Sequence, residues 1–391
     1  MSLKDLRGKI AIVGVGTAGC GEAHGMSDLE ILTQAAKAAV EDAGLAMKDM
    51  DGLCTANLNS AMWPLNVVEG LGVRPKFVDG TNVGGAAFVA HQLPAMLALN
   101  AGLCDAVLVC YGSTQRTATF GRKERSAARI LLDPDPFQTP YKPFNPPSSY
   151  ALIAARHMHQ YGTTRRHLAE VAVAARKWAQ LNPEAFARDP LDIDTVLKAR
   201  MISDPLTAYD CCLVTDGAAA YVMTRADRAK ELRKTPVYIL SNATAVWHRS
   251  VSSMRDLTVT PSKDSGERAF AAAGLGPKDM HMLQTYDAFS INTILALEDL
   301  GFCGKGEGGA FVENGAIAPG GKFPVNTNGG GLSCVHPNMY GAFITIEAVR
   351  QLRGECGERQ VKGAKTAVVN GNGGNSASCQ STSVLATADA L

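Results

Sequence analysis

Ten cysteines are the first candidates for chemistry in this sequence, because a thiolate can attack a carbonyl group or bind a soft metal ion. They stand at positions 20, 54, 104, 110, 211, 212, 303, 334, 356 and 379. No two of them form a C-x-x-C pair, which argues against a zinc or iron–sulfur site. Most lie in apolar runs such as 103–110, which favours buried, free thiols in a reducing compartment. We therefore expect no metal centre and no disulfide framework.

A glycine-rich stretch follows the first predicted strand, residues 9–13. Gly14, Gly16 and Gly19 have the G-x-G-x-x-G spacing of a dinucleotide site. Such a site needs a helix that begins on the glycines. Here the next helix start is the capping box Ser27-Asp28-Leu29-Glu30, eight residues after Gly19, and the helix is predicted to end near Ala43, before Gly44. The spacing argues against a nucleotide site.

Composition excludes several classes of protein. Of 391 residues, 46% are hydrophobic and 19% are charged, against a usual charged share of about 25%, so a large interior is expected. A net charge of +1 argues against nucleic-acid binding. The first residues are too short and too charged for a secretory signal, and the most apolar stretch, 83–103, is interrupted by polar residues. We expect a soluble, cytoplasmic protein without a membrane span.

An internal repeat indicates how the chain is organised. The segment Ala43–Met50 matches Ala273–Met280 at an offset of 230, with six of eight residues identical. Each copy has a predicted strand before its helix (10–13 and 237–240) and another after it (53–56 and 282–285). A match with the same surroundings predicts two copies of one α/β unit.

Each predicted half adds a later helix and strand, and an insertion separates the halves. The helices and strands are predicted over 85–100, 105–110, 341–352 and 365–369, and a strand at 216–223 closes the first half. Residues 111–150 are irregular and rich in Pro, Arg and Ser, and helices are predicted over 150–161 and 167–180. Arg122, Lys123 and Arg125 are interpreted as a solvated charge run, in preference to a phosphate clamp. The predicted domains are 1–112 with 204–230, the insertion 113–203, and 231–391.

Four ordered motifs resemble those of thiolases of the sterol-carrier-protein-x branch. They are Ser203–Leu206 with Asp216–Ala220, Tyr286-Asp287-Ala288-Phe289-Ser290, Gly329-Gly330 with Val335-His336-Pro337, and Gly371-Asn372-Gly373-Gly374. The resemblance covers essentially the whole chain. It implies an α/β thiolase fold, in which the duplicated halves form a five-layered αβαβα body with helices buried between two sheets, an inserted loop domain and a homodimer.

Two departures from the thiolase pattern bear on function. Thiolases carry a nucleophilic cysteine at the start of the helix predicted here from residue 85, where free N–H groups stabilise a thiolate. Counting back from Gly102–Asp105 places the missing cysteine at Gly85, within one residue. The second thiolase cysteine is also absent, since Val369-Asn370 stands in its place. Covalent acyl transfer therefore lacks its usual attacking group.

Two tyrosines stand where thiolases have other residues. Tyr286 replaces a motif histidine, and Tyr340 follows His336 by four residues. This pattern resembles the cysteine-less thiolase-fold aldolases of steroid side-chain degradation. The resemblance implies retro-aldol cleavage of a β-hydroxyacyl-CoA by two tyrosines. It also implies a small partner protein with a zinc ribbon and an OB-fold, and coenzyme A only as part of the substrate, with no permanently bound cofactor.

Retro-aldol chemistry requires a base for the β-hydroxyl proton, stabilisation of the thioester enolate and an acid for the enolate carbon. Tyrosine can transfer protons if its surroundings lower its pKa from about 10. We predict Tyr286 and Tyr340 as the acid/base pair, without assigning which is which, and His336 as a group that holds the thioester oxygen or orients a tyrosine. The predicted supporting groups are Asp287, Asn82, Asn372, Gly84, Gly85, Gly373 and Gly374.

Structural readings of the same residues stay open. Tyr286 and Tyr340 could be packing residues, His336 could stabilise a turn, and the glycine loop could be only a tight turn. Two other functions also remain. One is an acyltransferase or thiolase with a relocated nucleophile, for which Cys334 is favoured over Cys54 and Cys303. The other is a non-catalytic thiolase-fold protein that binds CoA or supports a partner.

Overall fold

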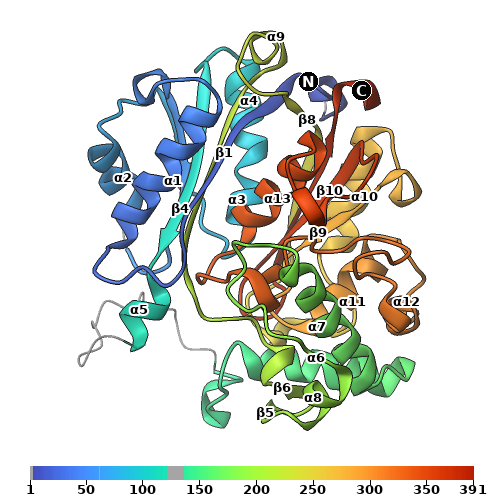
Figure 1. The fold of residues 1–391 in the computed structure, drawn as a ribbon. Coiled ribbons are helices and arrows are strands. Elements are labelled where there is room, and N and C mark those ends of the chain that lie inside the picture. Colours follow the sequence, from blue (N-terminus) through green and yellow to red (C-terminus); the bar gives the residue numbers. More distant parts are fainter. Residues whose placement is uncertain (1–2, 61, 121–135) are drawn as a thin grey trace.

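A computed structural model describes residues 3–60, 62–120 and 136–391. The charge run at Arg122, Lys123 and Arg125 lies outside these residues. Nine strands form one mixed sheet in the order β3-β2-β4-β7-β1-β8-β11-β10-β9 (Figure 1). Its two halves meet where β1 (Ile10–Gly21) pairs antiparallel with β8 (Val237–Val246), Ile10 lying opposite Ile239.

The first half contains five strands of the sheet. Its elements are β1, α1 (Asp28–Asp42), β2 (Gly52–Thr55), α2 (Trp63–Leu71), β3 (Phe77–Asp79), α3 (Ala87–Ala90), α4 (Gln92–Asn100), β4 (Ala106–Ser113), α5 (Gln115–Phe120), β7 (Asp216–Arg225) and α9 (Ala226–Ala229). The capping box predicted at Ser27 is present. The Ser27 side chain accepts a hydrogen bond from the N–H of Glu30, and the Glu30 side chain accepts one from the N–H of Ser27.

The second half repeats this plan with four strands. Its elements are β8, α10 (Ser262–Ala273), β9 (Leu283–Thr285), α11 (Ser290–Asp299), α12 (Gly308–Val312), α13 (Gly341–Arg353), β10 (Thr366–Gly373) and β11 (Cys379–Ala386). The sequence repeat is also a structural repeat. Asp49 accepts the N–H of Ala46 at 2.9 Å, and Asp279 accepts that of Gly276 at 2.7 Å.

Five layers follow from the helix contacts. Helices α1 and α2 cover the outer face of the first half, and α10 and α11 lie outside the second (Figure 1). Helices α3, α4 and α13 lie between the halves, because they contact strands of both. The predicted α/β layering is present. The resemblance to thiolases implied two sheets, and here these two sheets are joined into one by the pairing of β1 with β8.

The insertion contributes helices and a small hairpin. It contains α6 (Pro147–Tyr161), α7 (Arg165–Gln180), α8 (Ile193–Lys198), β5 (Met201–Ser203) and β6 (Leu206–Thr207). These elements gather below the sheet in Figure 1, where α7 packs against α11, α12 and a turn of π-helix at Gly330–Cys334. The predicted boundary after residue 203 falls inside the β5–β6 hairpin.

Two details differ from the sequence-based expectations. Gly14, Gly16 and Gly19 belong to β1 and allow α1 to pack closely, since a Cβ on Gly16 would lie 2.6 Å from the nitrogen of Ala39. The helix predicted over 85–100 is interrupted at His91, between α3 and α4. No helix in the described part of the chain is long and apolar enough to cross a membrane.

Candidate active site

The predicted site residues converge because parallel strands end at the same edge of the sheet. Strands β9 and β10 are parallel, with Asn370 opposite Thr285. Tyr286 follows β9, and its N–H binds the carbonyl of Asn370 at 2.9 Å. Gly373 ends β10, and Tyr340 directly precedes α13. Two loops and the beginning of one central helix thus bring distant residues together.

Tyr286, His336 and Tyr340 form one buried aromatic cluster. The hydroxyl of Tyr286 lies 2.9 Å from Nε2 of His336 and 3.1 Å from the carbonyl oxygen of Asn338. The ring centroids of Tyr286 and Tyr340 are 5.6 Å apart at an interplanar angle of 82°. Tyr340 donates its hydroxyl hydrogen to Oδ1 of Asn328 at 2.9 Å. The structure therefore brings all three predicted catalytic residues together.

Burial decides the protonation of this cluster. It raises the pKa of the Tyr286 and Tyr340 phenols well above 10, so both are protonated near neutral pH. It lowers the pKa of His336 to about 4, so this imidazole is neutral. The surroundings thus raise both phenol pKa values, whereas a tyrosine that acts as a base by itself would need a lowered pKa. A neutral imidazole can instead accept a hydrogen from Tyr286.

The Asp287 side chain is hydrogen-bonded to the turn beside the cluster. Its carboxylate accepts the N–H groups of Gly331 at 2.6 Å and Leu332 at 3.4 Å. Gly330 permits this approach, because its φ is +65° and a Cβ there would lie 2.7 Å from Cγ of Asp287. Burial raises the pKa of Asp287 to about 7. These hydrogen bonds tie the carboxylate to the turn and not to the phenols.

The predicted glycines form a close contact between the two halves. A Cβ on Gly84 would lie 2.8 Å from the nitrogen of Gly374, and one on Gly373 would collide with the carbonyl group of Val83. A Cβ on Gly85 would lie 2.6 Å from Cζ of Tyr286 and closer still to its Cε2. Side chains at these positions would separate the loops that frame Tyr286.

The two asparagines differ in position. Asn372 is buried, where its Nδ2 donates to the Tyr150 hydroxyl at 2.8 Å and its Oδ1 accepts from Gln380 at 2.8 Å. Asn82 is exposed and stabilises its own loop, donating to the carbonyl of Asn57 at 3.0 Å and accepting from the N–H of Gly84 at 3.2 Å. The structure does not bring Asn82 to the tyrosines, because its side chain turns back to the first half.

Sequence reasoning missed two neighbours of the site. Asn328 holds the Tyr340 hydroxyl and also accepts the N–H of Gly330 at 2.8 Å. Its place directly before Gly329-Gly330 was the one available signal. Tyr150 reaches the terminal glycine loop from the insertion, and nothing near it in the sequence indicates this contact.

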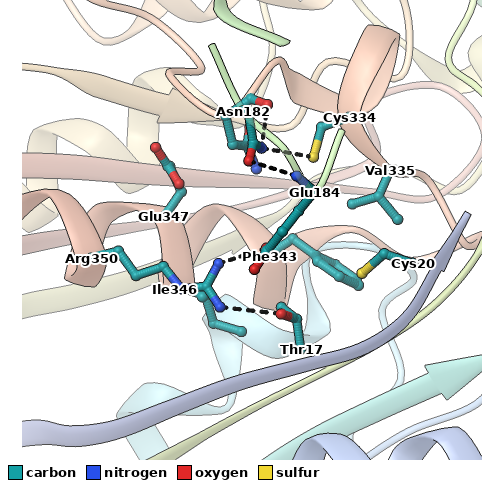
Figure 2. Close-up of a pocket in the computed structure, with 11 residues that line it drawn as sticks. Thr17, Cys20, Asn182, Glu184, Cys334, Val335, Phe343, Ile346, Glu347 and Arg350 are labelled. Atoms are coloured by element: carbon teal, nitrogen blue, oxygen red, sulfur yellow. Dashed lines mark hydrogen bonds and ion pairs between the residues drawn. The ribbon is translucent and has the colours of Figure 1, made fainter. Parts of the chain in front are cut away.

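The alternative nucleophile Cys334 lines a pocket between β1, the loop after α7 and α13 (Figure 2), and Asn328 lines the same pocket. Arg350 crosses this pocket and donates to Glu184 at 2.8 Å and Thr17 at 3.1 Å. Burial raises the pKa of Cys334 well above 9, so its sulfur is a thiol and not a thiolate. Burial also raises the pKa of Cys54 well above 9 and that of Cys303 to about 12. All ten cysteines are free.

Comparison with known proteins assigns the family. A model of the family described as thiolase C-terminal domain-like matches residues 243–387. The acetyl-CoA acetyltransferase of Methanothermobacter thermautotrophicus is 34% identical to this chain, over 93% of the chain and 96% of the relative. The chain belongs to the thiolase superfamily. The prediction of a thiolase fold and the prediction of a thiolase-superfamily enzyme are thereby confirmed.

Two further thiolase-superfamily relatives match over nearly the full length. The 17-hydroxy-3-oxo-4-pregnene-20-carboxyl-CoA lyase of Mycobacterium tuberculosis is 36% identical over 89% of this chain and 92% of the relative. A solved structure of the "Ltp2-ChsH2(DUF35) aldolase" superposes with a TM-score of 0.88 at 29% identity, covering 98% of both chains. The predicted similarity to thiolase-fold aldolases is confirmed. Relatives of similar identity are thus named as a transferase and as a lyase, so the residues of the site must distinguish these activities.

Proposed function

We propose that this protein cleaves a carbon–carbon bond of a β-hydroxyacyl-CoA by retro-aldol chemistry. The observation that carries the proposal is the pair Gly85 and Tyr286. The superfamily nucleophile is missing at residue 85, and a phenol bonded to a neutral histidine fills the adjacent space. A proton-transfer group stands beside the position where the attacking thiolate is missing. Retro-aldol cleavage needs proton transfer but no nucleophile, whereas acyl transfer through an acyl-enzyme needs both.

The proposed base is Tyr286 acting together with His336. The β-hydroxyl of the substrate gives its proton to the Tyr286 oxygen as Tyr286 passes its own to Nε2 of His336. The bond between the α- and β-carbons then breaks. Its electron pair forms the enolate of the shorter acyl-CoA, and the β-carbon leaves as a carbonyl compound. The relay avoids a free phenolate, which the raised pKa of Tyr286 disfavours.

The proposed acid is Tyr340. Its hydroxyl is bonded to Asn328, and it protonates the enolate carbon to give the shorter acyl-CoA. Backbone N–H groups of Gly85 and of the facing pair Gly373–Gly374 are the candidate donors to the enolate oxygen, since the predicted donor Gly84 already gives its N–H to Oδ1 of Asn82. The proton held by His336 returns through Tyr286 to the Tyr340 oxygen as Tyr340 protonates the enolate carbon, so neither phenol is left as a free phenolate.

We also propose the partners that the resemblance implies: an acyl-CoA substrate, a second copy of the chain and a small zinc-ribbon/OB-fold protein. The matched aldolase structure supports the small partner, because its name joins ChsH2(DUF35) to the aldolase. Exposed apolar side chains support protein contacts at two places. They are Met62, Leu65 and Val78 near the outer strand β3, and Phe137, Tyr141 and Phe144 in the insertion.

The test is to incubate the full-length protein with β-hydroxyacyl-CoA substrates and to separate the products by chromatography. We expect a shorter acyl-CoA and a carbonyl compound in equal amounts. Tyr286→Phe and Tyr340→Phe should each lower kcat by about 100-fold or more, with the cooperative thermal transition retained. Tyr238→Phe, a buried tyrosine of β8, is the control and should retain activity. Full activity in both site variants would refute the proposal.

One observation favours a second candidate, an acyltransferase. The Methanothermobacter relative, with 34% identity, is named acetyl-CoA acetyltransferase. This activity would need a relocated nucleophile, and Cys334 is the cysteine that the motifs favour for that role. Burial raises the pKa of its thiol, which weighs against this role. Intact-protein mass spectrometry after mixing with acetyl-CoA would support this candidate if a stable acyl group appeared on a cysteine.

A further inference from the structure

The insertion reaches into the candidate active site through Tyr150. This residue belongs to α6, is fully buried and stacks on Phe289, with ring centroids 4.5 Å apart and an interplanar angle of 25°. Its hydroxyl oxygen accepts the Nδ2–H of Asn372 at 2.8 Å and the backbone N–H of Ala377 at 2.9 Å. The two donors lie on either side of Gly373–Gly374. One phenol from a distant part of the chain thus clamps both ends of the terminal glycine loop.

One residue of the clamped loop, Ala377, has an unfavourable backbone conformation. Gly374 has a φ of +76°, and Ala377 has a φ of +52°, in the left-handed region that residues with a Cβ rarely adopt. Within the loop, the N–H of Ser378 binds the carbonyl of Gly373 at 2.9 Å. The bond from Ala377 to Tyr150 therefore stabilises the loop at a residue whose backbone does not favour this conformation by itself.

The position of this loop sets distances inside the cluster. The nitrogen of Gly374 lies 2.8 Å from where a Cβ on Gly84 would be, and the carbonyl oxygen of Asn372 lies 2.7 Å from the corresponding point on Gly85. The N–H of Tyr286 binds the carbonyl of Asn370 in the strand that leads into the loop. A shift of Asn372–Ala377 would change the space around Gly85 and Tyr286 directly.

The clamp continues away from the site. Gln380 of β11 donates its Nε2–H to Oδ1 of Asn372, which fixes the amide so that Nδ2 faces Tyr150. Gln380, Asn372 and Tyr150 form a chain of side-chain hydrogen bonds, and all three are buried. The hydrogen bonds in such a chain strengthen one another, and the loss of one of them leaves buried polar groups without a partner.

We propose that Tyr150 is a positioning residue, through which the insertion holds the terminal glycine loop in register with Gly84–Gly85 and Tyr286. It acts on the reaction through the loop and not on the substrate. The inference rests on the retro-aldol function proposed above. It explains why a phenol of the insertion is hydrogen-bonded on both sides of the glycine pair.

The test is Tyr150→Phe in the full-length protein, which keeps the ring stacked on Phe289 and removes only the hydroxyl. Misplacement of a catalytic loop can cost up to about 100-fold in rate. We expect kcat to fall by about 10- to 100-fold with KM changed by less than about threefold, because the loop shapes the transition state more than the bound substrate. Hydrogen exchange of the backbone amides at 371–378 should rise, whereas exchange at β4 should stay unchanged.

Tyr221→Phe is the matched control, since Tyr221 is also a fully buried phenol and donates to the carbonyl of Phe88 in the middle layer. It should leave exchange at 371–378 unchanged. If Tyr150→Phe does not fold, Gln380→Met removes the other end of the chain and should raise exchange at 371–378 and lower kcat in the same direction. Wild-type kcat together with wild-type exchange in the folded variant would overturn the inference.

The two proposals can fail separately. If the wild-type protein cleaves no β-hydroxyacyl-CoA, the proposed function fails, and the exchange measurement still decides whether Tyr150 holds the loop. If the wild-type protein cleaves its substrate and Tyr150→Phe does so at the same kcat, the positioning role fails and the function stands.

Discussion

The ring of Tyr286 occupies the space that any side chain on residue 85 would need. A Cβ on Gly85 would lie 2.6 Å from Cζ of this ring and 2.7 Å from the carbonyl oxygen of Asn372. Non-bonded atoms cannot approach so closely without moving their surroundings. A nucleophile at position 85 and a tyrosine at position 286 are therefore mutually exclusive in this backbone. The absence of a cysteine at position 85 and the presence of a tyrosine at position 286 are thus structurally linked.

This exclusion predicts strong coupling between the two positions. Gly85→Cys alone should lower the free energy of unfolding by more than Gly85→Cys does in a Tyr286→His background, where the smaller ring frees space. The coupling energy should be about 1–3 kcal/mol, measured by a double-mutant cycle in urea. Gly276→Ala is the control, because a Cβ on Gly276 would meet only Oδ2 of Asp279, at 3.8 Å. Additive effects at positions 85 and 286 would show that the ring can move aside.

His336 should be required as the acceptor for Tyr286. In His336→Phe the phenol loses its partner at 2.9 Å, so we expect kcat to fall by about 10²- to 10⁴-fold with a smaller change in KM. His281→Phe is the control, because His281 binds Thr366 at the opposite edge of the sheet. Steady-state kinetics on both variants checks this. A His336→Phe protein with wild-type kcat would exclude the proposed relay.

Asp287 should make stability depend on pH. Burial raises its pKa from 3.8 to about 7, so the folded protein binds this proton more tightly than the unfolded chain. The contribution to stability is then complete below about pH 4 and is lost as pH rises through about 7. Asp287→Asn should lose stability relative to wild type at pH 4, and the deficit should shrink by pH 8. Urea unfolding at several pH values measures this. A deficit that is the same at every pH would contradict the shifted pKa.

Cys334 should be dispensable for chemistry. Its thiol is buried and protonated, and it accepts a hydrogen bond from Asn182 at 3.5 Å. Cys334→Ala should keep kcat within about twofold, because no step of the proposed reaction uses a thiolate. Cys356→Ala, at a second buried thiol, is the control. Loss of activity in Cys334→Ala, with an acyl group on Cys334 in the wild-type protein, would instead establish the acyltransferase.

Local sequence signals predicted much of the fold. The capping box at Ser27 and the glycine after Ala43 set the limits of α1 within a residue or two, because these residues satisfy the backbone groups at a helix end. The repeat at Asp49 and Asp279 predicted matching turns for the same reason. Strand β11 escaped prediction. It is fully buried, yet its residues 380–383 are all polar, so it lacks the apolar pattern by which a buried strand is identified.

The candidate site was predictable only where its residues belong to motifs. Tyr286, His336 and Tyr340 lie together as expected. The contact of Tyr150 with Asn372 joins residues more than 200 positions apart, and no periodicity carries such information. The shifted pKa values follow from burial, which depends on the whole packed structure. The collision at Gly85 likewise follows from backbone positions and not from residue type alone.

The place of β1 in the sheet has a consequence for how the chain is made. Ile10 lies between Arg225 on β7 and Ile239 on β8, so both neighbours of the first strand are synthesised only after the insertion. Until those strands emerge from the ribosome, an apolar strand has no partner on either side, and pairing over such a sequence distance is slow. A nascent chain that stops before residue 216 would present this strand to other chains and be prone to aggregate.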